Sequence, residues 1–227
     1  VMFVDPSGKG KDATGYAVVK MLNGNLYVPD AGGLNGGYSD AVLTTLSKIA
    51  KTNKVNTILV ESNMGGGMFA ELLKPFLMRY HPCEVKDVRN NKTKELRIID
   101  TLEPVMNSHR LIIDRKVVEK DYRSNPNEAP ERKLKLQLFY QMSRITRHRG
   151  SLVHDDILDA LSGAVAYWTE YMNQDEDRNI RSRKDELLRV HLDSWGSLIN
   201  NSITQTAMGM SPSQISNSNT PDDGFIS

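Results

Sequence analysis

Three short apolar runs separated by turn sequences fill the first part of this chain, and they constrain its fold more than any other feature. The runs are VMFVDPS (1–7), GYAVVKML (15–22) and NLYVPDAGG (25–33). The intervening SGKGKDATG and NGN are rich in glycine, aspartate and asparagine, which favour tight reversals of the chain. The pattern predicts an antiparallel meander of three strands.

Helical and strand-like segments alternate after the meander. YSDAVLTTLSKIAKTNK (38–54) has apolar residues at helical spacing, whereas VNTILVESN (55–63) is a continuous apolar run typical of a central strand buried on both faces. The following segments predict helices at 68–81, 94–108, 134–146 and 154–172, a short strand at 83–89 and a turn-rich loop at 123–133. We therefore expect an α/β fold with a mixed central sheet flanked by helices.

The composition changes after residue 172, where the chain becomes first charged and then rich in serine, asparagine and threonine. We expect a domain over residues 1–172 and a C-terminal tail over 173–227, with one short helix near 183–195 and disorder after it. No apolar run approaches the roughly 20 residues that span a bilayer, so no membrane association is expected. The single cysteine, Cys83, excludes a disulfide framework and favours a reducing compartment such as a cytoplasm. Valine at position 1 favours a segment of a longer protein.

Acidic residues stand where three of these predicted elements begin or end. Asp5 and Glu61 each close an apolar strand, and HDDILDAL (154–161) opens a helix with Asp155, Asp156 and Asp159. Carboxylates brought together in this way repel one another and desolvate badly unless a divalent cation neutralises them. The arrangement predicts a Mg²⁺ or Mn²⁺ site, with two ions, and phosphodiester hydrolysis as its chemistry.

The choice among the helix acids follows from helical spacing. Asp155 and Asp159 are one turn apart, on the side opposite the apolar stripe, whereas Asp156 shares a flank with the small residues Ala160 and Gly163. We expect that flank to approach the sheet, which makes Asp156 the third metal ligand, with Asp155 beside a second ion or a bound water. The alternatives are a turn-starting role for Asp5 before Pro6 and stabilisation of the helix dipole by the aspartates.

Several weaker candidates surround this acidic set. Asp12, in the first turn, is an outer ligand or a plain turn residue, and the glycines of MGGG are phosphate contacts or a tight turn. Residues 110–149 hold eleven Lys and Arg against five Asp and Glu, which suggests a phosphate track or a solvated surface. The expected DNA contacts, all weakly supported, are Gly65, Gly66, Lys92, Lys94, Arg97, Arg144, Arg147 and Arg149.

The order of these motifs resembles the nuclease domain of tailed-phage large terminases, most of all those of short-tailed podophages. FVDPSG, ILVESN, KTKELRI and HDDILDALSGAVAYW occur in family order, and the last is the most specific. The resemblance covers residues 1–172 and implies a ribonuclease-H-like, resolvase-like fold. It also implies metal ligands at Asp5, Glu61 and one of Asp155 and Asp156, with Asp159 as a supporting acid.

What the resemblance implies about activity goes further than these residues. It implies an endonuclease that cuts concatemeric double-stranded viral DNA during packaging in the host cytoplasm and is absent from the mature virion. The partners implied are an N-terminal ATPase domain of the full-length protein, the portal ring and the small terminase. Two alternatives stay open: a non-catalytic module that docks on DNA or the portal, and a cellular resolvase or ribonuclease H of the same fold.

Overall fold

The computed structural model describes residues 1–7, 13–62, 67–89 and 93–207. The described residues form two compact units, within residues 1–172 and 173–227, and the division falls inside the last helix. Among the described helices, none has an apolar stretch long enough to cross a membrane.

The predicted meander is confirmed. It consists of β1 (Met2–Asp5), β2 (Thr14–Leu22) and β3 (Asn25–Leu34), with β1 antiparallel to β2 and β2 antiparallel to β3. A tight reversal joins β2 to β3 at Asn23 and Gly24, which both have positive φ. This backbone conformation is one that asparagine and glycine adopt at low cost.

Parallel strands complete the sheet on both sides of the meander. On one side β4 (Thr57–Glu61) pairs with β1, and β5 (Glu84–Val88) pairs with β4; on the other, β6 (Leu111–Ile113) pairs with β3. Within the described residues the sheet has six strands in the order β5-β4-β1-β2-β3-β6. The sheet is therefore mixed and flanked by helices, as the sequence predicts.

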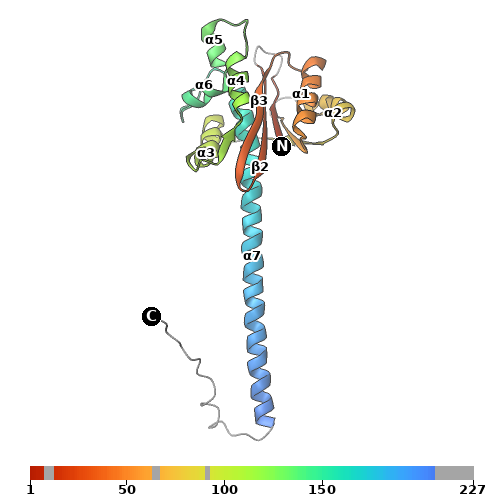
Figure 1. The fold of residues 1–227 in the computed structure, drawn as a ribbon, viewed down its shortest axis with the longest axis vertical. Helices are drawn as coiled ribbons and strands as arrows, with labels where there is room; N and C mark the ends of the chain where they lie inside the picture. The colour runs from red at the N-terminus through yellow and green to blue at the C-terminus, as the bar shows by residue number, and fades with distance from the viewer. Residues whose placement is uncertain (8–12, 63–66, 90–92, 208–227) are drawn as a thin grey trace. The chain divides into compact units, whose positions relative to one another are not determined.

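Each face of the sheet has its own apolar core. Met2, Val4, Ile58 and Val60 point to the face covered by α1 (Asp40–Asn53) and α2 (Met68–Tyr80). Phe3 and the other alternate residues of the same strands point to the opposite face. That face is covered by α3 (Lys94–Asn107), α4 (Arg115–Arg123), α6 (Leu138–Arg144) and the start of α7 (Asp156–Ala207). Figure 1 shows α1 and α2 on one side of the strands and α3, α4 and α6 on the other.

Three sequence expectations are wrong in detail. The helix expected at 134–146 is split into α5 (Pro130–Lys135), which lies partly in the expected loop, and α6. The sequence reading missed β6 and α4. The last helix does not stop near residue 172 but continues to Ala207, past the separate short helix expected near 183–195. Residues 173–193 contain no proline or glycine and many Glu, Arg, Lys and Leu, which sustain a helix despite their polarity.

Candidate functional site

Asp5 and Glu61 meet because they end neighbouring parallel strands. In β1 and β4, Val4 lies beside Val60, so the next residue of each strand stands at the same edge of the sheet. Side chains alternate between faces along a strand, and Asp5 and Glu61 therefore point to the same face as Phe3 and Leu59. That face is the one covered by α3 and α7.

Two glycines bring α7 close to this edge. A Cβ on Gly163 would lie 2.4 Å from Phe3 Cε2, and a Cβ on Gly15 would lie 2.1 Å from the backbone oxygen of Asp156. Gly15 is the cross-strand partner of Asp5, so the first turn of α7 lies directly beside the end of β1. The close approach expected from the small residue Gly163 is therefore present.

The helix acid that joins Asp5 and Glu61 is Asp159. One carboxylate oxygen from each of these three residues lies within 4.8 Å of the other two. Asp159 is fully buried and Glu61 nearly so, whereas Asp5 is half-buried. We call Asp5, Glu61 and Asp159 the acidic triad.

This geometry differs from the sequence expectation, which preferred Asp156 and placed Asp159 on the side of the helix away from the apolar stripe. The crossing of α7 over Gly15 sets the backbone of Asp156 against β2, and the side chain of Asp159, almost one turn later, lies beside the residues that end β1 and β4. Asp156 is not in the triad, but its charge contributes to raising the pKa of Asp5. Asp155 contacts Lys94, with its Oδ1 2.9 Å from Lys94 Nζ.

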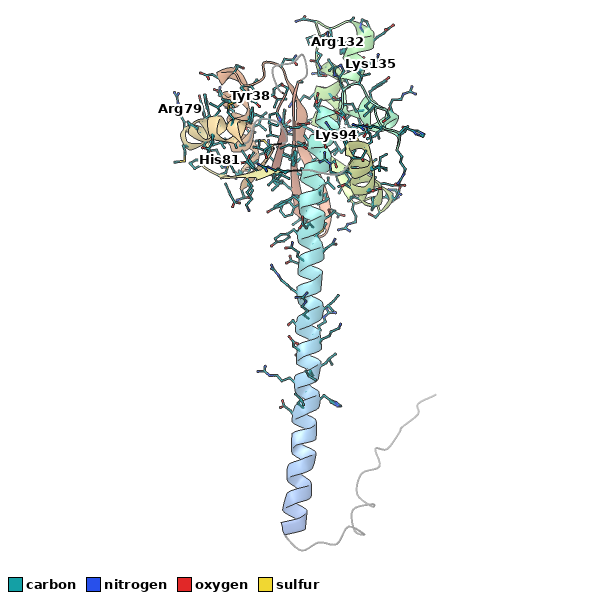
Figure 2. All side chains as sticks on the ribbon, turned by 180° about the vertical axis from the view of Figure 1, so that it is seen from behind. Tyr38, Arg79, His81, Lys94, Arg132 and Lys135 are labelled. Carbon is teal, nitrogen blue, oxygen red and sulfur yellow. The ribbon has the colours of Figure 1, made fainter. Side chains whose placement is uncertain are left out.

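Two basic side chains from the first turn of α3, those of Lys94 and Arg97, contact the acidic triad. Lys94 Nζ lies 3.0 Å from Asp159 Oδ2 and 3.5 Å from Asp5 Oδ2. Arg97 Nη2 lies 2.7 Å from Asp159 Oδ1 and 3.7 Å from Glu61 Oε1. Figure 2 labels Lys94 beside α7, among the side chains of this region. In this structure both residues contact the acids, and the contacts of both with DNA phosphates stay a prediction.

Burial and neighbouring charges shift the pKa values of Asp5 and Lys94. Burial raises the pKa of Asp5 to about 8; Lys94 opposes this rise, and the nearby charges of Asp159, Glu61 and Asp156 add to it. Burial works against a charged Lys94, but the surrounding Asp159, Asp5 and Asp155 outweigh it and raise the pKa of Lys94 above its ordinary value. Asp5 therefore holds a proton near neutrality when no other cation is present, while Lys94 stays charged.

A buried polar frame, missed by the sequence reading, holds the first turn of α7. The Gln141 side chain is 1% exposed, and its Oε1 accepts the Leu158 N–H at 3.1 Å. In turn, Asp121 accepts the N–H groups of Leu138 and Phe139 at the start of α6, which carries Gln141. Gln141 lies within the helix expected at 134–146, whereas Asp121 lies in α4, which was not expected from the sequence.

The remaining candidates lie apart from the triad or outside the described residues. Arg147 pairs with Asp100 and Glu103 of α3, and Arg144 lies over the Tyr140 ring at 5.7 Å. Arg149 is exposed in the segment before α7. Asp12, Gly65, Gly66 and Lys92 lie outside the described residues.

Comparisons with known proteins agree with this fold. Residues 4–111 match the family model described as "Terminase Bacteriophage T7, Ribonuclease H-like domain". The large terminase subunit of Enterobacteria phage T3 is 40% identical over 193 residues, which are 85% of this chain and 33% of that protein. The chain thus spans about a third of the length of this curated relative.

Solved structures of the human cytomegalovirus terminase nuclease domain share the fold. One, soaked with Mn and bound to an inhibitor, has a TM-score of 0.51 and 15% identity over 73% of this chain and 80% of its own. A second has a TM-score of 0.51 and 14% identity over 73% of this chain and 81% of its own. At these identities the likeness concerns the fold alone. The matches to the family model and to the phage T3 subunit show that the chain belongs to the ribonuclease-H-like domain family of terminase large subunits.

Proposed function

We propose that this domain is a divalent-metal-dependent endonuclease that cleaves double-stranded DNA. The observation that carries the proposal is the acidic triad, because three carboxylates from β1, β4 and α7 converge to within 4.8 Å of one another. The membership of this chain in a terminase domain family supports DNA as the substrate. We assign the catalytic activity to residues 1–172.

The residues of the triad fit a hard divalent cation. Mg²⁺ and Mn²⁺ prefer carboxylate oxygens, and buried carboxylates at this spacing need a compensating positive charge. Asp5, Glu61 and Asp159 would hold one ion, and Asp155 and Asp156 are the candidates to complete a site for a second. When bound, such ions supply an activated water and stabilise negative charge on the phosphate and the departing oxygen.

The chain's own residues prepare this site through charge and position. Lys94 partly neutralises Asp155 and Asp159 when no metal is bound, and its side chain is 35% exposed. Asp5 must release its proton before both of its oxygens can act as anionic ligands. Gln141 fixes the backbone of the turn that carries Asp159.

The biological setting of this activity follows from the relatives. We propose that the domain cuts concatemeric viral DNA during genome packaging, within the infected host cell. The corresponding partners are an ATPase domain of the same subunit, the portal ring and the small terminase. The phage T3 relative is a large terminase subunit three times as long as the stretch it shares with this chain, which supports the presence of further functional parts in such proteins.

Cleavage of supercoiled plasmid with Mg²⁺, Mn²⁺ or EDTA tests the proposal. Asp5→Asn, Glu61→Gln and Asp159→Asn should each abolish metal-dependent nicking and linearisation, because each removes an anionic ligand while keeping the size of the side chain. Asp156→Asn tests the ligand expected from the sequence. Asp40→Asn is the matched control, because Asp40 is an exposed aspartate at the start of α1 on the other face of the sheet.

The outcomes separate the proposal from a non-catalytic docking module. A docking module would bind DNA with no metal dependence and no cleavage, and the triad substitutions would leave binding unchanged. Cleavage that persists in all three folded triad variants would exclude the triad as the active site.

A further inference from the structure

We propose that Arg97 is a positioning residue that holds Asp159 and Glu61 at ligand distance from each other and stays paired with them when a metal ion binds. This inference rests on the proposed metal site. It concerns a residue of α3 that the sequence reading expected to contact DNA and that the family resemblance did not include among the ligands.

The acidic triad cannot hold its geometry without help. Two of its members, Glu61 and Asp159, come from separate elements and have carboxylate oxygens within 4.8 Å of each other, where like charges in a poorly hydrated space repel strongly. Glu61 sits at the end of a rigid central strand, whereas Asp159 sits on a helix packed over that strand. A cation that contacts both of them can therefore hold their two carboxylates near each other.

Arg97 has the right position and chemistry for this role. Its Nη2 lies 2.7 Å from Asp159 Oδ1 and 3.7 Å from Glu61 Oε1, and its side chain is only 12% exposed. The planar guanidinium has several donors in a fixed arrangement, so it can serve two carboxylates at once with little loss of conformational freedom. Removal of one member of such a buried set leaves uncompensated charge behind.

Lys94 differs from Arg97 in the oxygen that it contacts. Lys94 Nζ faces Asp159 Oδ2 and Asp5 Oδ2, whereas Arg97 contacts the other oxygen of Asp159. The Lys94 side chain is also 35% exposed, about three times as much as that of Arg97. The Oδ2 of Asp159 can therefore exchange Lys94 for another cation while Arg97 keeps its contact with the Oδ1 of Asp159.

This difference predicts effects of opposite sign on metal binding. If Arg97 acts only through its positive charge, its removal makes the site more negative and strengthens Mn²⁺ binding. If Arg97 positions the two acids, its removal lets them separate and weakens Mn²⁺ binding despite the gain in negative charge. Lys94 serves as the matched control, because its removal should act through charge.

The experiment is a calorimetric titration of Mn²⁺ into wild type, Arg97→Gln, Arg97→Lys and Lys94→Gln proteins at one pH, with thermal unfolding in EDTA as the check on folding. We expect Arg97→Gln to raise the Kd for Mn²⁺ about tenfold or more, Arg97→Lys to restore part of the affinity, and Lys94→Gln to lower the Kd.

Binding by Arg97→Gln that is as tight as in the wild type, or tighter, would overturn the positioning role. If Arg97→Gln does not fold, Arg97→Lys carries the test in the same direction: weaker binding than wild type supports the role, and equal or tighter binding overturns it. The wild-type titration is a separate test of the metal site itself. A wild-type protein that binds no Mn²⁺ refutes the proposed function. If the wild type binds Mn²⁺ and Arg97→Gln binds it with the same Kd, only the role of Arg97 is refuted.

Discussion

Gly163 of α7 lies against the ring of Phe3 of β1 so closely that a Cβ at position 163 would be 2.4 Å from Phe3 Cε2. Asp159 is one turn earlier on the same helix, and Asp5 is two residues later on the same strand. The contact between Gly163 and Phe3 therefore sets how closely the helix acid approaches the strand acid.

Gly163→Ala should lower the free energy of unfolding, because the added methyl group overlaps the Phe3 ring. Overpacking of a filled core typically costs about 1–3 kcal/mol. The higher helix propensity of alanine returns at most about 1 kcal/mol. Urea unfolding measures the difference. A double-mutant cycle with Phe3→Leu is the control, since a smaller side chain at position 3 should reduce the penalty. A Gly163→Ala protein more stable than wild type would contradict the close packing of α7 on β1.

The pKa of Asp5 predicts that the metal-free protein loses stability as pH rises from about 5 to 8. An aspartate in the unfolded chain has a pKa near 3.9, whereas burial raises the pKa of folded Asp5 to about 8. Between these values the folded state binds the proton and the unfolded state does not, so the contribution of Asp5 to stability is largest in acid and is lost as pH approaches 8. The slope from one such group is at most about 1.4 kcal/mol per pH unit.

Urea unfolding in EDTA at pH 5.5 and pH 8, on wild type and Asp5→Asn, tests this prediction. The variant has no carboxyl group at position 5, so its stability should change less between the two pH values than that of the wild type. An identical pH dependence in the two proteins would show that Asp5 titrates at an ordinary pKa in the folded state.

Sequence alone predicted the parts of the site that depend on strand alternation. The apolar runs before Asp5 and Glu61 place both residues at strand ends, and parallel pairing of β1 with β4 then brings them together. The general requirement for a helix acid also followed from the sequence, because HDDILDAL opens a helix whose apolar stripe must face the sheet.

The choice between Asp156 and Asp159 could not follow from helical spacing. It depends on the angle and height at which α7 crosses the sheet, and these are set by tertiary contacts of Gly15 and Gly163 with residues far away in the sequence. The sequence also could not show what the side chains of Lys94 and Arg97 face. A basic pair at the start of a helix has the same sequence pattern whether it contacts solvent, phosphate or buried acids.

Lys94→Gln should destabilise the metal-free protein at pH 8, because it leaves the carboxylates of Asp5, Asp155 and Asp159 without the ammonium that lies 2.9–3.5 Å from them. Mn²⁺ supplies positive charge to the same acids, so saturating Mn²⁺ should raise the melting temperature of the variant more than that of the wild type. Differential scanning calorimetry with EDTA or Mn²⁺ measures both effects.

The matched control for Lys94→Gln is Lys74→Gln, which removes an exposed lysine from an ion pair with Glu71 on α2. An exposed pair of this kind contributes at most about 1 kcal/mol, so the control should change little under either condition. If both substitutions gave the same small change with and without Mn²⁺, Lys94 would not be neutralising the triad.

Gln141→Leu should lower the free energy of unfolding and loosen the first turn of α7. Leucine keeps much of the volume of glutamine, but it has no oxygen to accept the buried Leu158 N–H, whose loss of a partner costs about 1–3 kcal/mol. Gln141→Glu keeps an acceptor at the same position and is the control for that hydrogen bond, although it also places a charge in a site that is 1% exposed.

Hydrogen exchange followed by NMR locates the effect: in Gln141→Leu the Leu158 amide should exchange faster than in the wild type, by more than the amides of β1 and β4. Because Asp159 follows Leu158 directly, the same variant should also cleave DNA more slowly. If Gln141→Leu cleaved more slowly but the Leu158 amide exchanged at the wild-type rate, Gln141 would not act by holding this turn.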